Sequence, residues 1–187
     1  MLSLRYATIN DSEFVAWAVL VAVGIDQPDA DLLSKVSEMC RRTDVLYSWK
    51  NSLIAESNGN PVGSLTCYDG SGYQAMREIT FPIIAQNTGN DFSSMEMETG
   101  PGEFYLDSMA VLPECRKQGF ATSLLKAGVE RARELCIPRV AMVVSPEKPE
   151  AQRLYEFLGF RFERDMFLFG EDYRKMVKIL RDEEMKR

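Results

Sequence analysis

Strand and helix patterns alternate between residues 104 and 158, and this alternation restricts the folds open to the chain. Phe104–Val111 has the apolar character of a strand, and Ala121–Cys136 carries its apolar residues at helical spacing. A buried-type strand at Arg139–Val144 and a second helix at Pro149–Leu158 follow. This order predicts an α/β domain in which helices pack against a sheet.

Further elements are expected on both sides of this segment. They are a strand at Leu2–Ala7, a helix that follows an N-cap at residues 10–12 and runs to Gly24, a helix from Pro28, a hairpin of Ser52–Glu56 and Val62–Tyr68, and a final hairpin of Phe160–Phe169 and Tyr173–Leu180 turning at residues 170–172. The order β-α-α-β-β-insert-β-α-β-α-β-β predicts one domain over residues 1–187, built on a mixed sheet.

The insert, residues 71–103, is the least regular part of the sequence and contains several Pro and Gly residues. One short helix is expected within it, over Tyr73–Ile79. A long irregular connection in a compact domain is usually functional or mobile, so the insert is a candidate for the acceptor side of a site. The charged tail, residues 181–187, is expected to be solvated.

Composition excludes several kinds of active site. The sequence has no histidine, which removes Ser-His-Asp triads, Cys-His dyads and most zinc sites, and no metal is expected. Any general base must then be a carboxylate, a tyrosine, a lysine, a cysteine or water. The four cysteines form no C-x-x-C pair and are expected to be small buried hydrophobic residues.

The charge balance argues against anionic partners. The chain has 22 Lys and Arg against 28 Asp and Glu, a net charge of -6. Nucleic acids and anionic membranes are bound through clustered Lys and Arg, so neither partner is expected. No apolar run is long enough to span a bilayer and the first residues do not resemble a signal peptide, which favours a cytoplasmic location.

The segment from Arg116 to Ala121, RKQGFA, joins the strand 104–111 to the following helix. Unpaired amides at a helix start and the positive end of the helix dipole favour a bound anion. Gly119 lets the backbone approach phosphate oxygens, and Arg116 and Lys117 add positive charge. The spacing matches neither a P-loop nor a Rossmann fingerprint. By itself, the segment is either a pyrophosphate site or a plain turn with a solvated basic pair.

A second pattern lies on the last predicted helix. Ala151, Leu154 and Tyr155 share one face, Gly159 ends the helix and Phe160 starts the next strand. Together, the two patterns resemble the GNAT acyltransferase superfamily. Its mark is Gln/Arg-x-x-Gly-x-Gly/Ala after a strand, followed on a later helix by A-x-x-L-Y-x-x-x-G-F.

The detailed match covers about residues 104–160, and the element order fits the rest. The resemblance implies a mixed, mostly antiparallel sheet with a splayed central pair and flanking helices. It also implies an N-acetyltransferase that moves an acetyl group from acetyl-CoA to a primary amine of a small molecule or peptide, by direct attack through a tetrahedral intermediate. The implied cofactor-binding residues are Met109, Val111, Arg116, Lys117, Gln118, Gly119, Phe120, Ala121 and Thr122. The sequence departs from the family at Lys148, where Asn is frequent.

Leu106 and Met109 lie three residues apart in the strand 104–111, so strict alternation sends them to opposite faces of the sheet. A bulge near Ser108 would bring both to one face and splay this strand from its neighbour. The family is similar in holding its cofactor arm in such a splay. This likeness places the arm against Met109 and Val111, with an oxyanion-binding amide near Val111.

Two side chains are candidates for proton transfer. Tyr155 matches the family's usual tyrosine and is the expected acid toward the coenzyme sulfur, the alternative being a half-buried core aromatic. Asp107 is the expected base, because an acid within a core strand needs an explanation. A structural salt bridge and a substrate anchor are its other interpretations, and Glu103 is the second candidate for the base.

The insert also bears on the acceptor. It carries one base, Arg77, and the acids Glu78, Asp91, Glu96, Glu98 and Glu103. This surplus either steers a cationic amine to the site or forms a solvated acidic loop.

Two other functions and two interpretations of the last hairpin stay open. The functions are a non-catalytic acyl-CoA sensor of the same fold and an unrelated α/β nucleotide-binding domain; the lack of a three-glycine motif counts against the second. The apolar residues of the last hairpin predict either a homodimer or a hairpin that closes the core. These residues are Phe162, Met166, Phe167, Leu168, Phe169, Met176 and Val177.

Overall fold

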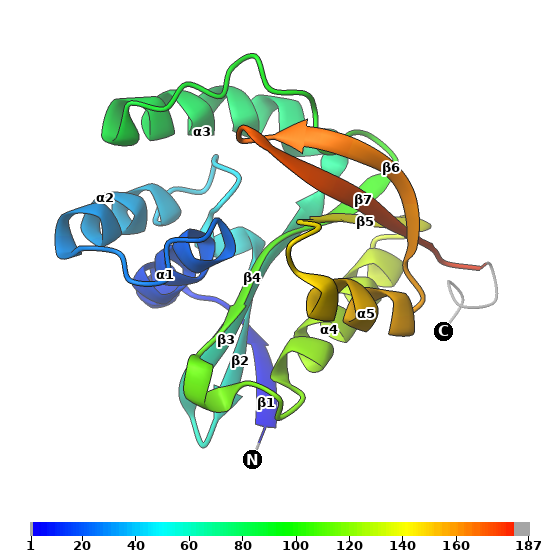
Figure 1. Ribbon diagram of the computed structural model, residues 1–187. Helices are drawn as coiled ribbons and strands as arrows, with labels where there is room; N and C mark the ends of the chain where they lie inside the picture. Colours follow the sequence, from blue (N-terminus) through cyan, green and yellow to red (C-terminus); the bar gives the residue numbers. More distant parts are fainter. Residues whose placement is uncertain (1, 182–187) are drawn as a thin grey trace.

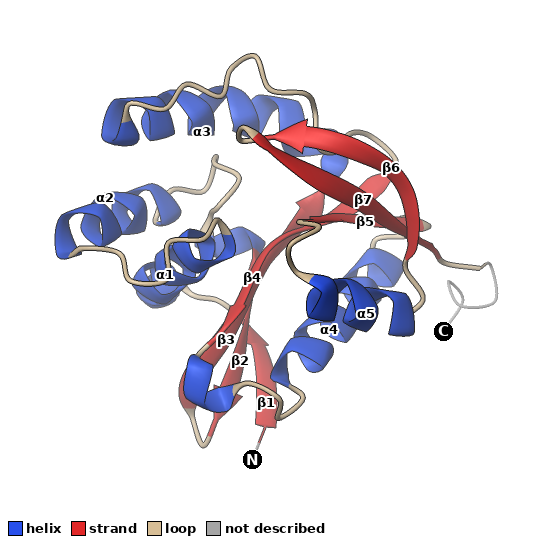
Figure 2. Ribbon diagram, viewed as in Figure 1, coloured by secondary structure: helices blue, strands red, loops and turns tan. Residues whose placement is uncertain are grey.

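The computed structural model describes residues 2–181, which contain seven strands and five α-helices (Figures 1 and 2). The strands are β1 (Leu2–Tyr6), β2 (Ser52–Ser57), β3 (Asn60–Asp69), β4 (Glu103–Val111), β5 (Arg139–Val144), β6 (Arg161–Leu168) and β7 (Glu171–Ile179). The helices are α1 (Ser12–Ala22), α2 (Ala30–Cys40), α3 (Tyr73–Thr88), α4 (Phe120–Glu134) and α5 (Pro149–Phe157).

The strands form one sheet in the order β1-β2-β3-β4-β5-β7-β6. Only β4 and β5 run parallel, and every other neighbouring pair is antiparallel. The parallel pair follows from the chain order, because β4 and β5 are joined through α4, a crossover that parallel neighbours require. The predicted mixed, mostly antiparallel sheet is confirmed.

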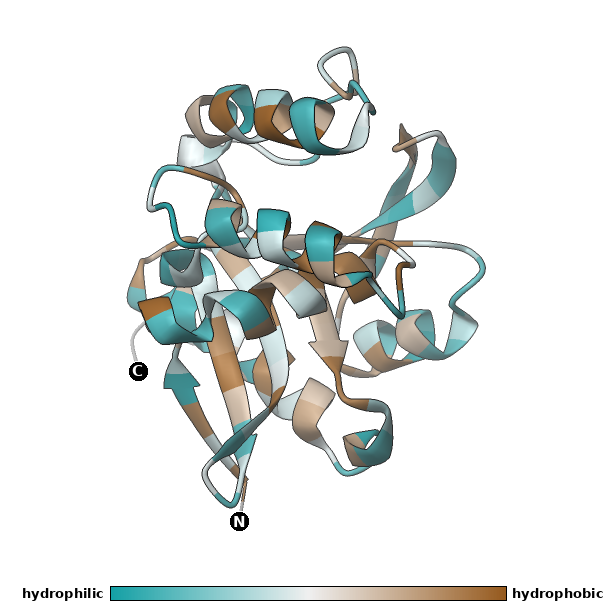
Figure 3. Ribbon diagram, turned by 90° about the vertical axis from the view of Figure 1, so that its left-hand side faces the viewer, coloured by the Kyte–Doolittle hydropathy of each residue, from teal (hydrophilic) through white to brown (hydrophobic). Residues whose placement is uncertain are grey.

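Helices cover both faces of the sheet. α4 and α5 pack on one face, where Phe104 and Leu106 of β4 join Leu124 of α4 in a buried cluster. α1, α2 and α3 pack on the other face, where Tyr105 joins a second cluster. Figure 3 looks onto this second face and shows mostly hydrophilic residues on the outer sides of the helices, with hydrophobic strands behind them. Alternation along β4 therefore supplies both layers of the core.

The helix expected at Tyr73–Ile79 is too short, because α3 continues to Thr88 through Pro82. Proline costs a helix one backbone hydrogen bond and crowds the preceding turn, which normally ends it. In α3, the side chains of Tyr73, Arg77 and Phe81 lie on one face of the helix and are buried, while Pro82 is exposed. Tertiary packing of this face outweighs the local penalty, so about half of the insert is regular helix.

The final hairpin turns at Phe169 and Gly170, one residue earlier than predicted, and β7 begins at Glu171. Both turn residues have positive φ, 54° and 84°, the geometry of a tight two-residue hairpin turn. Most of its apolar side chains are buried, while Phe162 and Phe167 are 52% and 63% exposed. The hairpin thus closes the core, and dimerisation stays a prediction.

Two further sequence expectations concern the tail and membranes. The predicted solvated tail, except Arg181, lies outside the described residues. Within residues 2–181, no helix combines the length and the apolar character needed to cross a membrane.

Candidate active site

The central strands β4 and β5 separate soon after they meet. Their pairing is limited to Glu103–Tyr105 against Arg139–Ala141. β4 then continues to Val111 and β5 to Val144 without pairing to each other. The predicted splay is present, and it frees backbone groups along the facing edges of both strands.

A bulge in β4 accompanies the splay. Leu106 pairs with Cys67 of β3 and Met109 pairs with Leu65, so three steps along β4 face two along β3. The extra residue falls at Asp107–Ser108, where the spacing of apolar residues predicts it. Leu106 and Met109 consequently both pack in the cluster under α4.

The part of β4 beyond the splay borders a cavity of about 500 Å³, here named the splay groove. It lies between the end of β4, the start of α4, α5 and the end of α1. Eight of the nine predicted cofactor-binding residues line it: Met109, Val111, Arg116, Lys117, Gly119, Phe120, Ala121 and Thr122. Gln118 does not line it, because its exposed side-chain amide donates to the Glu114 carbonyl at 3.0 Å.

Unpaired amides at the start of α4 border the splay groove. Gly119 is the N-cap residue, in the left-handed region with φ of 89°, and has no side chain to cap the helix. The first amide to bond back to it is that of Ser123, 3.0 Å from the Gly119 carbonyl oxygen. The amides of Phe120, Ala121 and Thr122 therefore have no partner within the helix. A Cβ added to Gly119 would have no heavy atom within 4 Å, so the space beside this residue is open, as the approach of an anion to the helix start requires.

Basic side chains also border the splay groove. Arg116 donates from Nε to the Val111 carbonyl at 3.2 Å, which ties the loop to the end of β4. Lys117 is exposed and has a positive φ of 60°. Lys148, at the start of α5, donates from Nζ to the Ala22 carbonyl at 3.3 Å and so connects α5 to α1. Two acidic residues also line the groove, so the positive charge that suits an anionic ligand is that of the basic pair beside the start of α4.

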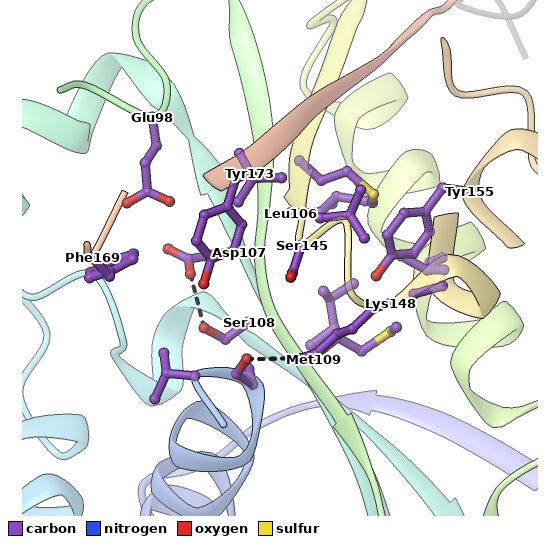
Figure 4. Close-up of a pocket in the computed structure, with 18 of the residues that line it drawn as sticks. Glu98, Leu106, Asp107, Ser108, Met109, Ser145, Lys148, Tyr155, Phe169 and Tyr173 are labelled. Atoms are coloured by element: carbon purple, nitrogen blue, oxygen red, sulfur yellow. Dashed lines mark hydrogen bonds between the residues drawn. The ribbon is translucent and has the colours of Figure 1, made fainter. Parts of the chain in front are cut away.

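A second cavity of about 210 Å³ adjoins the splay groove, and Met109, Lys148 and Tyr155 line both. It is named the acid cavity because Glu98 and Asp107 line it. Figure 4 shows these two carboxylates on one side of the cavity and Tyr155 on the other. Two carboxylates, which accept protons, and a tyrosine hydroxyl, which donates a hydrogen bond, therefore face the same space between the splayed strands.

Asp107 is half-buried on the bulge of β4. The Ser108 hydroxyl donates to one carboxylate oxygen at 2.9 Å, and the Tyr68 hydroxyl donates to the other. Burial raises the pKa of Asp107 to about 6, although both hydrogen bonds favour its charged form. Asp107 takes part in none of the ion pairs found in residues 2–181, so no structural salt bridge accounts for it.

Glu98 comes from the segment between α3 and β4 and is only 3% exposed. Its carboxylate accepts hydrogen bonds from the Tyr105 hydroxyl at 2.7 Å and the Tyr73 hydroxyl at 3.1 Å. Burial and the negative charge of Asp107 raise the pKa of Glu98 to about 7. The cavity therefore holds two carboxylates that take up protons near neutral pH.

Tyr155 projects from α5 and is half-buried, with its ring packed edge-on against Phe160 at 6.4 Å between centroids. Burial raises the pKa of its hydroxyl to about 12. At neutral pH, the hydroxyl is therefore protonated and is a hydrogen-bond donor.

The model of the acetyltransferase (GNAT) family matches residues 26–160 of the chain. The chain belongs to the GNAT acetyltransferase family. The family predicted from the two motifs is confirmed, and the protein is an acyltransferase. Comparison with curated proteins finds no match.

Solved acetyltransferases share the GNAT fold with this chain. One acetyltransferase crystal structure has a TM-score of 0.78 at 24% identity, covering 96% of this chain and 100% of that chain. An N-acetyltransferase from Staphylococcus aureus Mu50 has a TM-score of 0.76 at 18% identity, covering 94% and 100%. The aminoglycoside acetyltransferase AAC(6')-Ib, solved with coenzyme A, has a TM-score of 0.64 at 19% identity, covering 100% and 98%.

The structure argues against one candidate for the catalytic base of this GNAT protein. Glu103, the second choice for the base, lines neither cavity. Its carboxylate pairs with Arg139 at 2.7 Å and with Lys175 at 2.8 Å. Burial acts to raise the pKa of Glu103, but the hydrogen bonds from Lys175 and Arg139 outweigh it and lower the pKa. Glu103 is therefore a structural link between β4, β5 and β7.

Sequence reasoning missed the surroundings of Asp107 in this GNAT site. The sequence shows Glu98 only as one of several acids in the insert and Tyr73 only as an aromatic that lines a pocket or anchors the insert, and nothing in it connects either residue with Tyr105. One signal was available: Tyr105 and Asp107 are two residues apart in a strand and therefore share a face. Within residues 2–181, no group of three or more His, Cys, Asp or Glu side chains is suited to hold a metal.

Proposed function

We propose that this GNAT enzyme moves an acetyl group from acetyl-CoA to a primary amine of a small molecule or peptide, by direct attack through a tetrahedral intermediate. The lining residues that the two cavities share, Tyr155 among them, support the proposal. The splay groove offers an anion site, and the acid cavity offers two carboxylates. An anionic donor and a cationic acceptor would meet where the cavities join, which is the positioning that bimolecular transfer needs.

The splay groove fits acetyl-CoA in charge and in shape. The open space at Gly119 and the unpaired amides of residues 120–122 would receive the pyrophosphate, with Arg116 and Lys117 supplying charge. The free edge of β4 at Met109 and Val111 would pair with the amide-containing arm, as a strand edge pairs with an added strand. The bound donor supplies an activated thioester, and an amide near Val111 would stabilise the oxyanion.

Asp107 is the proposed base, and Glu98 is the proposed anchor of the acceptor. An ammonium group with a reference pKa of about 10.4 must lose a proton before it attacks. Two carboxylates in a small cavity would attract the ammonium, and its proton would pass to Asp107 directly or through a water. Asp107 is chosen because it lines the acid cavity together with Met109, which borders both cavities. In this proposal the acceptor is cationic, and residues 71–103 form its side of a single catalytic domain.

Tyr155 is the proposed donor to the leaving sulfur. A thiol has a reference pKa of about 8.5, well below the value of about 12 for this phenol. A hydrogen bond from Tyr155 would therefore stabilise the developing thiolate, while the proton stays on the phenol, because a thiolate is too weak a base to remove it.

The first test is calorimetric titration of acetyl-CoA into the wild type, Gly119→Ala and Gly119→Glu. Both variants place a side chain at a positive φ, so the alanine variant controls for backbone strain. Only glutamate adds a negative charge in front of the amides, and we expect it to bind at least about 100-fold more weakly than the alanine variant. Equal affinities of the two variants would contradict the pyrophosphate site.

The second test separates an enzyme from an acyl-CoA sensor. Release of free coenzyme thiol is followed with acetyl-CoA and a panel of primary amines, polar and apolar. Amine-dependent thiol release supports transfer. Tight acetyl-CoA binding without thiol release for any amine would instead favour the sensor.

A further inference from the structure

A third cavity, of about 250 Å³, lies between α1, α2, α3 and the β6–β7 turn. Six of the side chains that line it are Leu20, Leu32, Val36, Ile84, Phe92 and Phe169. Polar residues occur among its lining as well, and Asn87, Thr88, Asn90 and Glu171 are half-buried or exposed. The lining is thus largely apolar and has a polar part near solvent, so we name it the apolar cavity.

The apolar cavity adjoins the acid cavity. Val23, Tyr47, Phe169 and Tyr173 line both. A molecule with its amine beside Glu98 and Asp107 could therefore extend its remaining atoms past these four side chains into the apolar cavity.

Specific contacts hold Phe169, one of the side chains that line both cavities, in place. Phe169 sits in the hairpin turn with a positive φ of 54°, and its ring packs edge-on against Phe92 at 5.0 Å between centroids. Its amide donates to the sulfur of Met95 at 3.3 Å. The guanidinium of Arg77 donates to the carbonyls of Phe92, Met95 and Ser93 and so fixes this stretch of the insert. The cavity is therefore preformed, which lowers the cost of binding in it.

We propose that the acceptor is a primary amine carried on a single apolar body, with the amine in the acid cavity and the body in the apolar cavity. The inference rests on the proposed acetyl transfer and specifies its substrate class. A dry cavity of about 150 Å³ lined by Leu, Ile and Phe holds benzene, so about 250 Å³ suits an alkyl chain or a substituted ring.

A second ammonium on the acceptor is disfavoured by the same lining. Moving a charge onto an apolar surface costs free energy unless a partner compensates it. Among residues 2–181, the lining of the apolar cavity contains one carboxylate, that of Glu171, which is exposed, and exposed charges attract weakly in water. Polyamines and other polycations are therefore expected to be poor acceptors.

The test measures kcat/KM with saturating acetyl-CoA for the linear amines from n-butylamine to n-octylamine. Each added methylene is expected to raise kcat/KM about fourfold until the cavity is full, chiefly through KM. The matching α,ω-diamine has the carbon chain of n-octylamine and a second ammonium at its far end. We expect its kcat/KM to be at least tenfold below that of n-octylamine.

Adjacent residues of α3 provide matched variants. Ile84 lines the apolar cavity, whereas Ile83 lines a different surface depression with Met39, and both are half-buried. Ile84→Gln should remove most of the gain per methylene, and Ile83→Gln should keep it. Thermal unfolding and acetyl-CoA affinity are measured for both, so that a loss of fold is recognised.

The outcomes separate this inference from the proposed function. Transfer that is independent of chain length, or that favours the diamine, would overturn the apolar acceptor and leave the transferase assignment intact. A gain per methylene that is the same in well-folded Ile84→Gln would also overturn it. No transfer to any amine, despite normal acetyl-CoA binding, would overturn both.

Discussion

Glu98 and Asp107 reach one cavity from two different parts of the chain, and burial together with the negative charge of Asp107 raises the pKa of Glu98 to about 7. Glu98 comes from the end of the insert, and Asp107 comes from the bulge of β4. Tyrosine hydroxyls donate to both carboxylates. Keeping two acids together in this cavity is costly in free energy, which indicates that they serve a function.

The pH dependence of transfer should report this pair. With Asp107 as the base, kcat/KM falls as the pH drops, because protonation removes the base; the pair titrates together, with an inflection between about pH 6 and 7. Asp107→Asn should lower kcat about 10²–10⁴-fold.

Glu98→Gln removes the neighbouring charge and should move the inflection to lower pH. Glu78→Gln, an exposed acid of α3, is the matched control. An unchanged inflection in Glu98→Gln would argue against a coupled pair.

Glu98→Gln should also stabilise the protein at alkaline pH. The pKa of Glu98 rises from 4.5 to about 7 on folding, so the native state binds more protons between these values and stability is lost as the pH rises through them. Glutamine does not ionise and avoids this loss. We expect the variant to have a higher Tm than the wild type at pH 8, and the two Tm values to differ less at pH 5. Each kcal/mol of difference in the free energy of unfolding corresponds to about 2–4 °C in Tm for a domain of this size. A lower Tm at pH 8 would contradict a buried, unfavourable charge.

Tyr155→Phe removes only the hydroxyl of a side chain that lines the splay groove. We expect kcat to fall about 10²-fold, because the leaving thiolate loses its donor, while acetyl-CoA affinity changes little. Stopped assays of thiol release and calorimetry measure the two quantities. Tyr6→Phe, on the edge strand β1, is the control for a lost tyrosine hydroxyl. Wild-type kcat in Tyr155→Phe would leave Tyr155 as a packing residue.

Gly70→Ala should disturb the segment that carries Glu98. A Cβ at Gly70 would overlap the Gly100 carbonyl oxygen and lie 2.9 Å from that of Glu103, so backbone has to move. Overpacking of this kind costs about 1–3 kcal/mol. At Gly72 the nearest atom is the flexible end of Met76, 3.5 Å away, and Gly72→Ala is the matched control. Chemical denaturation of both variants measures the difference, and equal midpoints would contradict the steric argument.

The parts of the site that the sequence determined are local along the chain. The Gly119 loop and the start of α4 form one continuous segment, so their amides lie together whatever else the chain does. The bulge at Asp107–Ser108 was predictable because three-residue spacing of Leu106 and Met109 conflicts with the period of a strand. Such features depend on neighbours within a few residues, which the sequence displays directly.

Only the tertiary structure decided the acceptor side. α3 extends through Pro82 because buried contacts of its inner face outweigh a local penalty that sequence rules treat as decisive. Glu98 joins Asp107, and Phe169 joins Phe92, through packing between segments distant in the chain. Each of these residues has an ordinary local pattern, and its role depends on which side chains the fold brings beside it. Burial and neighbouring charge, rather than residue type, set the pKa values and the shape of the cavities.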